Sequence, residues 1–290
     1  MKRIALLLAL LTVVAGPARA QFNGITAELQ LIQDQYLPDE DLQLKVKITN
    51  RSGQTVSFGQ DNQWITFNIV GENSFIVPKI SEMPVSGHFT LPSGQSGALP
   101  LNLTPYFDFR RPGHYRIGAT IKISQWNQEI PCKPVSFTVA NGLPLHGRVN
   151  LQFGVPPPPG VSNAVPEVRN YSLLKVAYLN DLTLYFRLTD SNGRTLKVFP
   201  LSGMLSFSEP EAQLDRFNNL HVLVQTGARS FTYSVITPEG RLIARQRHEY
   251  SSTRPVLRAT DDGTIYVGGG LRRLSESDIP PPTAESARSQ

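Results

Sequence analysis

The sequence has 290 residues and almost no cysteine, since Cys132 is the single one. One thiol excludes an intramolecular disulfide and any zinc site built from several cysteines. We expect Cys132 to be a small buried apolar residue in a strand, the alternative being a thiol that pairs with another chain. Without crosslinks, stability has to come from hydrophobic cores of ordinary size.

Long apolar runs are missing outside the N-terminus. Residues 1–20 read MKRIALLLALLTVVAGPARA, where Lys2 and Arg3 precede an apolar stretch that ends in a small-x-small site at Ala18 and Ala20. This pattern is typical of a secretory signal peptide. The stretch is too short to span a bilayer comfortably, which takes about 20 apolar residues. We expect cleavage after Ala20, no transmembrane segment afterwards, and a secreted or periplasmic location.

A strong charge of one sign is missing as well. The full sequence carries a formal charge of +5, but removing residues 1–20 lowers Lys plus Arg from 28 to 25 against 23 acidic residues, which leaves +2. The remaining basic residues are scattered, whereas a nucleic-acid site needs a basic stripe on one face. We therefore expect no nucleic-acid partner.

Catalytic and metal-binding motifs are also missing. The sequence has no Gly-x-Ser-x-Gly elbow, no phosphate-binding glycine loop and no His-Glu-x-x-His motif. No histidine has a second His or Cys at ligand spacing, and His221, which alternates with apolar neighbours, is predicted on the wet face of a strand. The histidines are His88, His114, His146, His221 and His248. The sequence thus predicts no catalytic residue, no cofactor and no metal.

The dominant pattern that is present has a period of two. Residues 41–48 read DLQLKVKI and residues 115–123 read YRIGATIKI, so apolar side chains occupy every second position. Such alternation predicts strands with one buried and one wet face, as in antiparallel sheets. The only helical candidate is the short segment Glu209 to Phe217. The predicted fold class is all-β.

Residues 22–141 contain about eight strand candidates separated by turn clusters, a spacing typical of an antiparallel β-sandwich. The candidates lie near 25–33, 41–49, 63–70, 75–80, 86–91, 97–103, 114–124 and 131–139. Pro112 and Gly113 lead into Tyr115 at the start of the longest strand, which resembles the tyrosine corner of immunoglobulin-like folds. The resemblance to the immunoglobulin-like or fibronectin-like class implies a hydrogen bond from Tyr115 back across the turn. The Cys–Trp–Cys core of antibody domains is absent.

Residues 142–170 are predicted as a proline-rich junction, and an internal repeat follows over residues 171–270. The segment 173–193 aligns with 220–240 at an offset of 47, and the second half of the unit repeats at an offset of 45. Gly193 and Gly240 take equivalent turn positions where a positive φ is needed. Each unit reads as four strands and resembles a β-propeller blade. Residues 271–290 are polar and contain prolines, so they are predicted to be a disordered tail.

The number of repeats leaves the architecture of the second half open. A closed propeller needs at least four blades, whereas this chain has two units and one further strand. An open meander, a barrel-like closure, and blades completed by oligomerisation all remain. The fold predicted overall is an N-terminal antiparallel β-sandwich followed by an antiparallel β-meander of two blade-like repeats.

The two tryptophans receive different predictions. Trp64 opens an apolar strand and is predicted in the core. Trp126 lies in a polar hairpin tip beside Asn127 and Gln128, and an exposed Trp flanked by amides is typical of sugar or peptide contacts. The alternative is a tip tryptophan that folds back over the sheet. Trp126, Asn127 and Gln128 are the predicted binding residues.

The sequence predicts an exported, non-catalytic β protein that acts as a binding, scaffolding or assembly module at the cell envelope or outside the cell. Its partner would be an extracytoplasmic protein or a glycan, and an oligomer could form through the incomplete blades. The alternative is an enzyme or enzyme accessory acting on extracellular polysaccharide, which requires carboxylates that converge from separate strands.

Overall fold

The computed structural model describes residues 24–85, 87–145, 150–156, 166–179 and 181–279. The predicted signal peptide with Ala18 and Ala20, and also His146, lie outside the described residues. In the part of the chain that is described, nearly all regular structure is β, in several sheets that form no closed barrel. The predicted fold class is confirmed.

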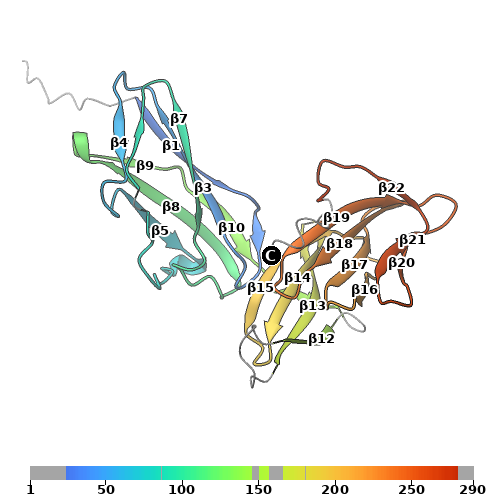
Figure 1. Ribbon diagram of the computed structural model, residues 1–290. Coiled ribbons are helices and arrows are strands. Elements are labelled where there is room, and N and C mark those ends of the chain that lie inside the picture. Colours follow the sequence, from blue (N-terminus) through green and yellow to red (C-terminus); the bar gives the residue numbers. More distant parts are fainter. Residues whose placement is uncertain (1–23, 86, 146–149, 157–165, 180, 280–290) are drawn as a thin grey trace, which may run out of the picture.

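The first half of the chain is a β-sandwich of ten strands and two short 3-10 turns. The strands are β1 (Ile25–Leu31), β2 (Gln35–Tyr36), β3 (Gln43–Asn50), β4 (Val56–Phe58), β5 (Ile65–Val70), β6 (Phe89–Leu91), β7 (Ser96–Asn102), β8 (Gly113–Ile123), β9 (Gln128–Pro131) and β10 (Val135–Val139). The turns are η1 (Glu72–Ser74) and η2 (Ser124–Trp126). Figure 1 shows these strands in blue to green, apart from the later sheets.

Two main sheets enclose the core of the sandwich. One has the order β1-β3-β7 and the other β2-β10-β8-β5, with β9 also on β8 and a small β4-β6 sheet at the side. Neighbouring strands are antiparallel except β2, which runs parallel to β10. The alternation along β3 and β8 sends every second side chain into one shared core. Trp64 and Cys132 are buried in that core, as predicted.

One predicted strand of the sandwich is wrong. Residues 75–80 form only isolated bridges at Ile76 and Lys79. Pro78 lies between these bridges and has no N–H to donate to a ladder, which explains why the pairing does not extend. Phe75, Ile76 and Ile80 are exposed accordingly.

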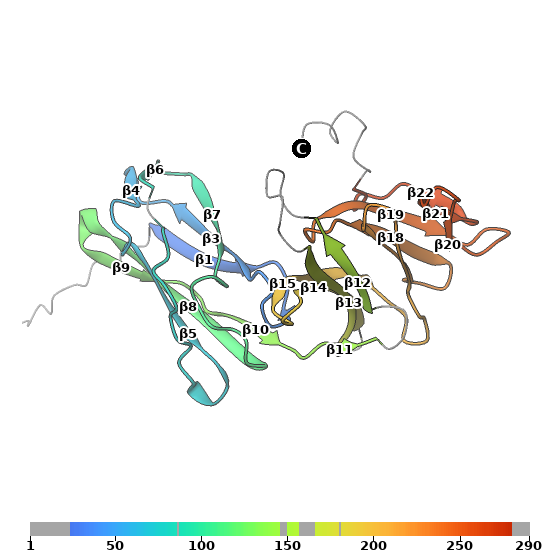
Figure 2. The same cartoon turned by 60° about the horizontal axis from the view of Figure 1, so that its bottom comes forward.

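The second half of the chain is a meander of sheets that lie face to face. Its strands are β11 (Leu143–Pro144), β12 (Asn150–Val155), β13 (Glu167–Tyr178), β14 (Asp181–Asp190), β15 (Thr195–Gly203), β16 (Glu211–Leu214), β17 (Leu220–Gln225), β18 (Ser230–Ile236), β19 (Leu242–Glu249), β20 (Val256–Ala259), β21 (Ile265–Gly268) and β22 (Leu271–Arg273). We call β11 to β15 the first repeat sheet, β16 to β19 with β22 the second repeat sheet, and β20 with β21 the terminal hairpin. Figure 2 shows them in this order from the sandwich outward.

The sequence repeat is a structural repeat. The offset of 47 places β13, β14 and β15 over β17, β18 and β19, and the offset of 45 places β16 over β20. The second repeat sheet carries apolar side chains on both faces, and each face packs against a neighbouring sheet. Leu220, Val222, Val224 and Ile236 share a core with the first repeat sheet. Leu223, Phe231, Tyr233, Val235 and Ala244 share another with Leu257 and Ile265 of the terminal hairpin.

Three segments differ from what the sequence predicts for them. The helical candidate at Glu209 to Phe217 is wrong, because it forms β16 and a turn. The junction at 142–170 contains β11, β12 and the start of β13, which belong to the first repeat sheet. The prediction of a disordered tail is wrong for residues 271–279, because β22 pairs with β19 and Ile279 forms a β-bridge with Arg245. Pairing at the edge of an existing sheet outweighs the polar composition of this segment.

The two halves meet at a small apolar contact with polar groups around it. Leu37 of the sandwich packs with Leu174, Val176, Tyr185 and Val198 of the first repeat sheet. The hydroxyl of Tyr185 donates to the carbonyl of Gln35 at 3.4 Å, and Lys197 lies 3.4 Å from Asp41. One face of the first repeat sheet therefore packs on the second repeat sheet, and part of its other face contacts the sandwich.

Candidate functional site

A cavity of about 450 Å³ lies between the second repeat sheet and the terminal hairpin. Its apolar walls include Val235 and Ile243 from the sheet, and Ile265 and Val267 from the hairpin. The cavity arises because the hairpin has two strands and covers only part of a five-stranded sheet. Its size and its mainly apolar walls with a few polar groups are typical of ligand sites. We call it the histidine cavity, after His221 and His248.

His221 is held between an aspartate and a tyrosine at one end of the histidine cavity. Its Nε2 lies 3.2 Å from Oδ2 of Asp215, and its Nδ1 lies 2.6 Å from the hydroxyl of Tyr233. An Nε2–H that donates to Asp215 leaves Nδ1 to accept the hydrogen of Tyr233. Burial lowers the pKa of His221 although Asp215 opposes this, and burial raises the pKa of Tyr233 to about 12. Imidazole and phenol are therefore both neutral at neutral pH.

Asp215 organises the turn that leads into β17. Its Oδ1 accepts the backbone N–H groups of Phe217 and Asn219, each at 2.8 Å, and its Oδ2 accepts the Asn219 side-chain amide at 2.9 Å. Burial by itself would raise the pKa of Asp215, but hydrogen bonds from Asn219, His221 and Phe217 lower it overall. The carboxylate is thus ionised and fully engaged in fixing this turn and His221.

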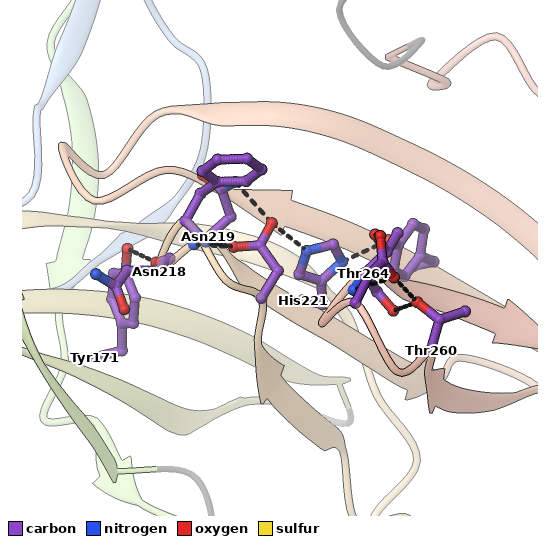
Figure 3. A network of polar contacts seen from close by, with 10 residues as sticks. Tyr171, Asn218, Asn219, His221, Thr260 and Thr264 are labelled. Atoms are coloured by element: carbon purple, nitrogen blue, oxygen red, sulfur yellow. Dashed lines mark hydrogen bonds and ion pairs between the residues drawn. The ribbon is translucent and has the colours of Figure 1, made fainter.

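The polar contacts continue to the neighbouring elements. The hydroxyl of Tyr171 in the first repeat sheet donates to the carbonyl of Asn218 at 3.0 Å. In the terminal hairpin the hydroxyls of Thr260 and Thr264 both bond Asp262. Figure 3 shows His221 between the turn at Asn219 and the turn at Thr260 and Thr264. The backbone N–H of Arg216 donates to the carbonyl of Gly263 at 3.3 Å, which joins the turn before β17 to the terminal hairpin.

His248 supplies the polar group of the histidine cavity that is not engaged. It is only 7% exposed, and among the described residues its Nε2 has no hydrogen-bond partner. Its ring meets that of Tyr233 edge-on at 6.2 Å between centroids. Burial and then the charge of Arg272 lower its pKa, so it is neutral at neutral pH. A buried neutral imidazole nitrogen without a partner is free to bind a ligand.

The outer edge of β21 borders the same cavity. Within the hairpin, the N–H of Thr260 donates to the carbonyl of Thr264, so this is a hydrogen-bonded pair of the antiparallel ladder. Hydrogen-bonded and non-hydrogen-bonded pairs alternate along such a ladder, and Ile265 and Val267 belong to non-hydrogen-bonded pairs. Their N–H and C=O groups point away from β20. Leu257, the partner of Val267 in β20, agrees with this alternation, because its N–H points away from β21 and donates to the Glu211 carboxylate at 2.7 Å. No described strand pairs with the outer edge of β21.

The predicted binding residues lie elsewhere, in the hairpin between β8 and β9. Trp126 is half-buried and packs against the sandwich core. Asn127 is exposed and left-handed with φ of 47°. Gln128 is half-buried, and its Oε1 has no hydrogen-bond partner within the described ranges. The structure does not bring these three residues near the histidine cavity by any described contact. Their role in binding stays a prediction.

The predicted structural residues occupy tight turns. The hydroxyl of Tyr115 donates to the carbonyl of Arg111 at 2.6 Å, across the turn that holds Pro112 and Gly113. Gly193 and Gly240 end equivalent turns with φ of 79° and 77°. Each donates its N–H three residues back, to Asp190 at 3.1 Å and to Thr237 at 2.8 Å.

The histidine cavity does not follow from the sequence pattern, because the alternation around His221 predicts a wet face. That prediction is wrong, since His221 is only 6% exposed. A signal was present in the repeat: Leu174 occupies the equivalent position 47 residues earlier and is also buried. The stretch LHVLV is apolar on both faces, which is typical of a strand covered from two sides.

The comparisons with known proteins add little. No family model matches the sequence, and no curated protein matches it. Among solved structures, the sporulation control protein Spo0M from Bacillus subtilis is similar with a TM-score of 0.31 and 11% identity, over 61% of this chain and 89% of that chain. A similarity this low carries no argument about fold or function. No helix in the described ranges has the length and apolarity needed to cross a membrane. The described residues also hold no cluster of three or more His, Cys, Asp or Glu side chains suited to a metal ion.

Proposed function

We propose that the protein is an exported, non-catalytic binding module that accepts an extended segment of a partner protein along the outer edge of β21. The observation that carries this proposal is the edge of β21, which pairs with no described strand. It borders a cavity lined by apolar side chains and by Nε2 of His248, which has no hydrogen-bond partner among the described residues. Added strands bind in this way through backbone hydrogen bonds, while pockets for alternate side chains provide selectivity.

The geometry of such a complex follows from which residues of β21 direct their backbone N–H and C=O groups away from β20. The N–H and C=O groups of Ile265 and Val267 would bond the incoming strand. Its side chains alternate between the two faces, so every second one would enter the histidine cavity. An apolar side chain there would meet Val235 and Ile243, and a polar one would meet Nε2 of His248.

The finer fold assignments support a role in binding. We infer that the sandwich is immunoglobulin-like, because β1-β3-β7 and β5-β8-β10 match the A-B-E and C-F-G strands of that fold and Tyr115 makes a tyrosine-corner bond. The repeat sheets are best described as an incomplete, propeller-like stack, since each repeat contributes a four-stranded meander before the terminal hairpin. Both folds commonly present loops and edges to partners, although a fold alone does not determine function.

The state of the polar groups supports a non-catalytic role. The raised pKa of Tyr233 keeps it a phenol rather than a nucleophilic phenolate. Asp215 is the one carboxylate among the described residues that line the histidine cavity, whereas an enzyme acting on polysaccharide needs two that face each other. Export is supported by the pattern of residues 1–20, with a secreted or periplasmic location.

The test uses residues 21–290 and a phage-displayed library of random peptides of about ten residues, the length of a long strand. We expect enrichment of peptides with alternating apolar residues. Val267→Pro removes an N–H that would donate to the incoming strand. Binding should weaken about tenfold, which corresponds to the free energy of one well-aligned hydrogen bond. Val267→Ala keeps the N–H and is the matched control for the lost side chain.

The proposal fails if no peptide family is enriched. It also fails if the enriched peptides bind Val267→Pro and Val267→Ala equally well. Thermal unfolding followed by circular dichroism verifies that both variants remain folded.

A further inference from the structure

A second cavity, of about 410 Å³, lies on the opposite side of the second repeat sheet. It is bordered by the end of β15, by β18 and β19, and by the segment 275–278 near the C-terminus. Its walls are mostly hydroxyls and charged groups, with Leu201 as the apolar exception. We call it the hydroxyl cavity.

The hydroxyl cavity concentrates buried polar atoms that have no partner. In the described part of the chain, nine buried side-chain nitrogen and oxygen atoms lack a hydrogen bond, and four of them belong to residues lining this cavity. They are Oγ of Ser202, Nε of Arg245 and both carboxylate oxygens of Asp278. Buried polar groups are normally hydrogen-bonded, because leaving them unpaired costs free energy. Their convergence in one cavity indicates a polar ligand.

The chain builds this cavity by returning its C-terminal segment to the sheet. β22 pairs with β19, and Ile279 forms a two-way backbone bridge with Arg245. Between these anchors a turn donates the Asp278 N–H to the Ser275 carbonyl at 3.0 Å and turns the Asp278 carboxylate inward. In the part of the chain that the structure describes, the nearest cation is Arg272, at 3.8 Å from Asp278. Asp278 is therefore held over the cavity by backbone bonds rather than by a strong ion pair.

The charges of the hydroxyl cavity favour a neutral ligand. Arg245 makes no ion pair with a described residue, whereas Arg247 lies 3.5 Å from Glu249 and donates to Ser230 at 3.1 Å. An anion attracted by Arg245 would meet the carboxylate of Asp278, and a cation attracted by Asp278 would meet Arg245. A ligand with many groups that both donate and accept hydrogen bonds satisfies both sides.

We propose that the hydroxyl cavity binds a saccharide. Adjacent sugar hydroxyls would donate to Asp278 and accept from Arg245, and the hydroxyl of Ser202 would complete the contacts. The volume is within the usual ~300–1,000 Å³ of small-ligand sites. This site is separate from the peptide edge at β21, because the two cavities lie on opposite faces of the second repeat sheet.

The test is ligand-observed saturation-transfer NMR on residues 21–290, with glucose, galactose, N-acetylglucosamine and maltose as probes. Titration calorimetry then gives the affinity of any sugar that binds. Asp278→Asn and Ser202→Ala change residues of different elements, so one variant remains informative if the other fails to fold. Each should weaken binding about tenfold, as expected for a lost hydrogen bond to a well-fixed group. Glu276→Gln changes an exposed charge in the same segment and should leave binding unaltered.

Three results would overturn the proposal. The first is that none of the four sugars binds. The second is that a sugar binds equally well to Asp278→Asn, Ser202→Ala and the wild type. The third is that glycine or inorganic phosphate, run as ionic probes, binds in competition with the sugars and more tightly. Val267→Pro should leave sugar binding intact, which keeps this outcome distinct from that of the peptide experiment.

Discussion

Glu40 lies buried in the sandwich close to the contact with the first repeat sheet, and its replacement gives the sharpest test of these physical arguments. The carboxylate accepts the backbone N–H of Leu37 at 2.8 Å and the side-chain amide of Gln33 at 2.5 Å. Burial nevertheless raises its pKa from 4.5 to about 7, with a further contribution from the charge of Asp41. The folded protein therefore binds a proton here more tightly than the unfolded chain does.

The sign of the effect follows from this raised pKa. The stability contributed by the protonated carboxyl is fully present below pH 4.5 and is lost as the pH rises through about 7. One pKa unit corresponds to about 1.4 kcal/mol, so the difference between the folded and unfolded pKa values amounts to about 3 kcal/mol. Glu40→Gln is neutral at every pH and avoids this loss. The variant should be similar to the wild type near pH 4.5 and about 3 kcal/mol more stable at about pH 8.

The assay is urea unfolding followed by tryptophan fluorescence at several pH values. Trp64 and Trp126 both belong to the sandwich, so the signal reports on the half of the chain that contains Glu40. Glu129→Gln removes an exposed carboxylate from the same sandwich and should change stability by less than about 0.5 kcal/mol. A stability difference between Glu40→Gln and the wild type that does not vary with pH would refute the reasoning.

Three further predictions concern stability. Tyr115→Phe removes the hydroxyl that bonds Arg111 and should destabilise the sandwich by about 1 kcal/mol in the same fluorescence assay, and an unchanged midpoint would contradict the corner bond. Gly240→Ala and Gly193→Ala both introduce a side chain at positive φ, but only at Gly240 would the new Cβ come within 2.9 Å of Lys197. Circular dichroism should therefore show Gly240→Ala about 1 kcal/mol less stable than Gly193→Ala, and equal melting would show that the contact is irrelevant. Burial lowers the pKa of His248, so the stability contributed by its neutral form is fully present above the unfolded pKa and declines as the pH falls below about 6.5. The free energy of unfolding of His248→Leu relative to the wild type should therefore increase from pH 7.5 to pH 5. A difference that does not vary with pH would contradict the burial argument.

The fold could be predicted from local patterns wherever one face of a strand is buried and the other is wet. The alternation in 41–48 and 115–123 corresponds to β3 and β8, because period-two burial is a property of the strand itself. The offset of the internal repeat aligned β13 to β15 with β17 to β19 for the same reason, since equivalent residues face equivalent neighbours. Where Pro78 interrupts hydrogen bonding, the alternation alone predicted one strand too many.

The candidate site depended on contacts between distant segments. His221 and His248 are 27 residues apart in the sequence, and only the pairing of β17, β18 and β19 brings them to one face with Tyr233. The second repeat sheet is covered on both sides, so a residue predicted on a wet face is buried. Asp278 lies in a polar segment whose order comes from pairing with β19 rather than from its own composition.

Local patterns in the sequence were enough to predict most of the strands, the glycine turns and the lack of an intramolecular disulfide. These follow from side-chain periodicity, from turn chemistry and from the residue types available. The faces that are covered from both sides, the edge of β21 that no described strand pairs with, and the polar groups that meet in the two cavities became visible only in the folded chain. Those outcomes depend on how the sheets stack and where strands far apart in the chain pair, and no local pattern carries that information.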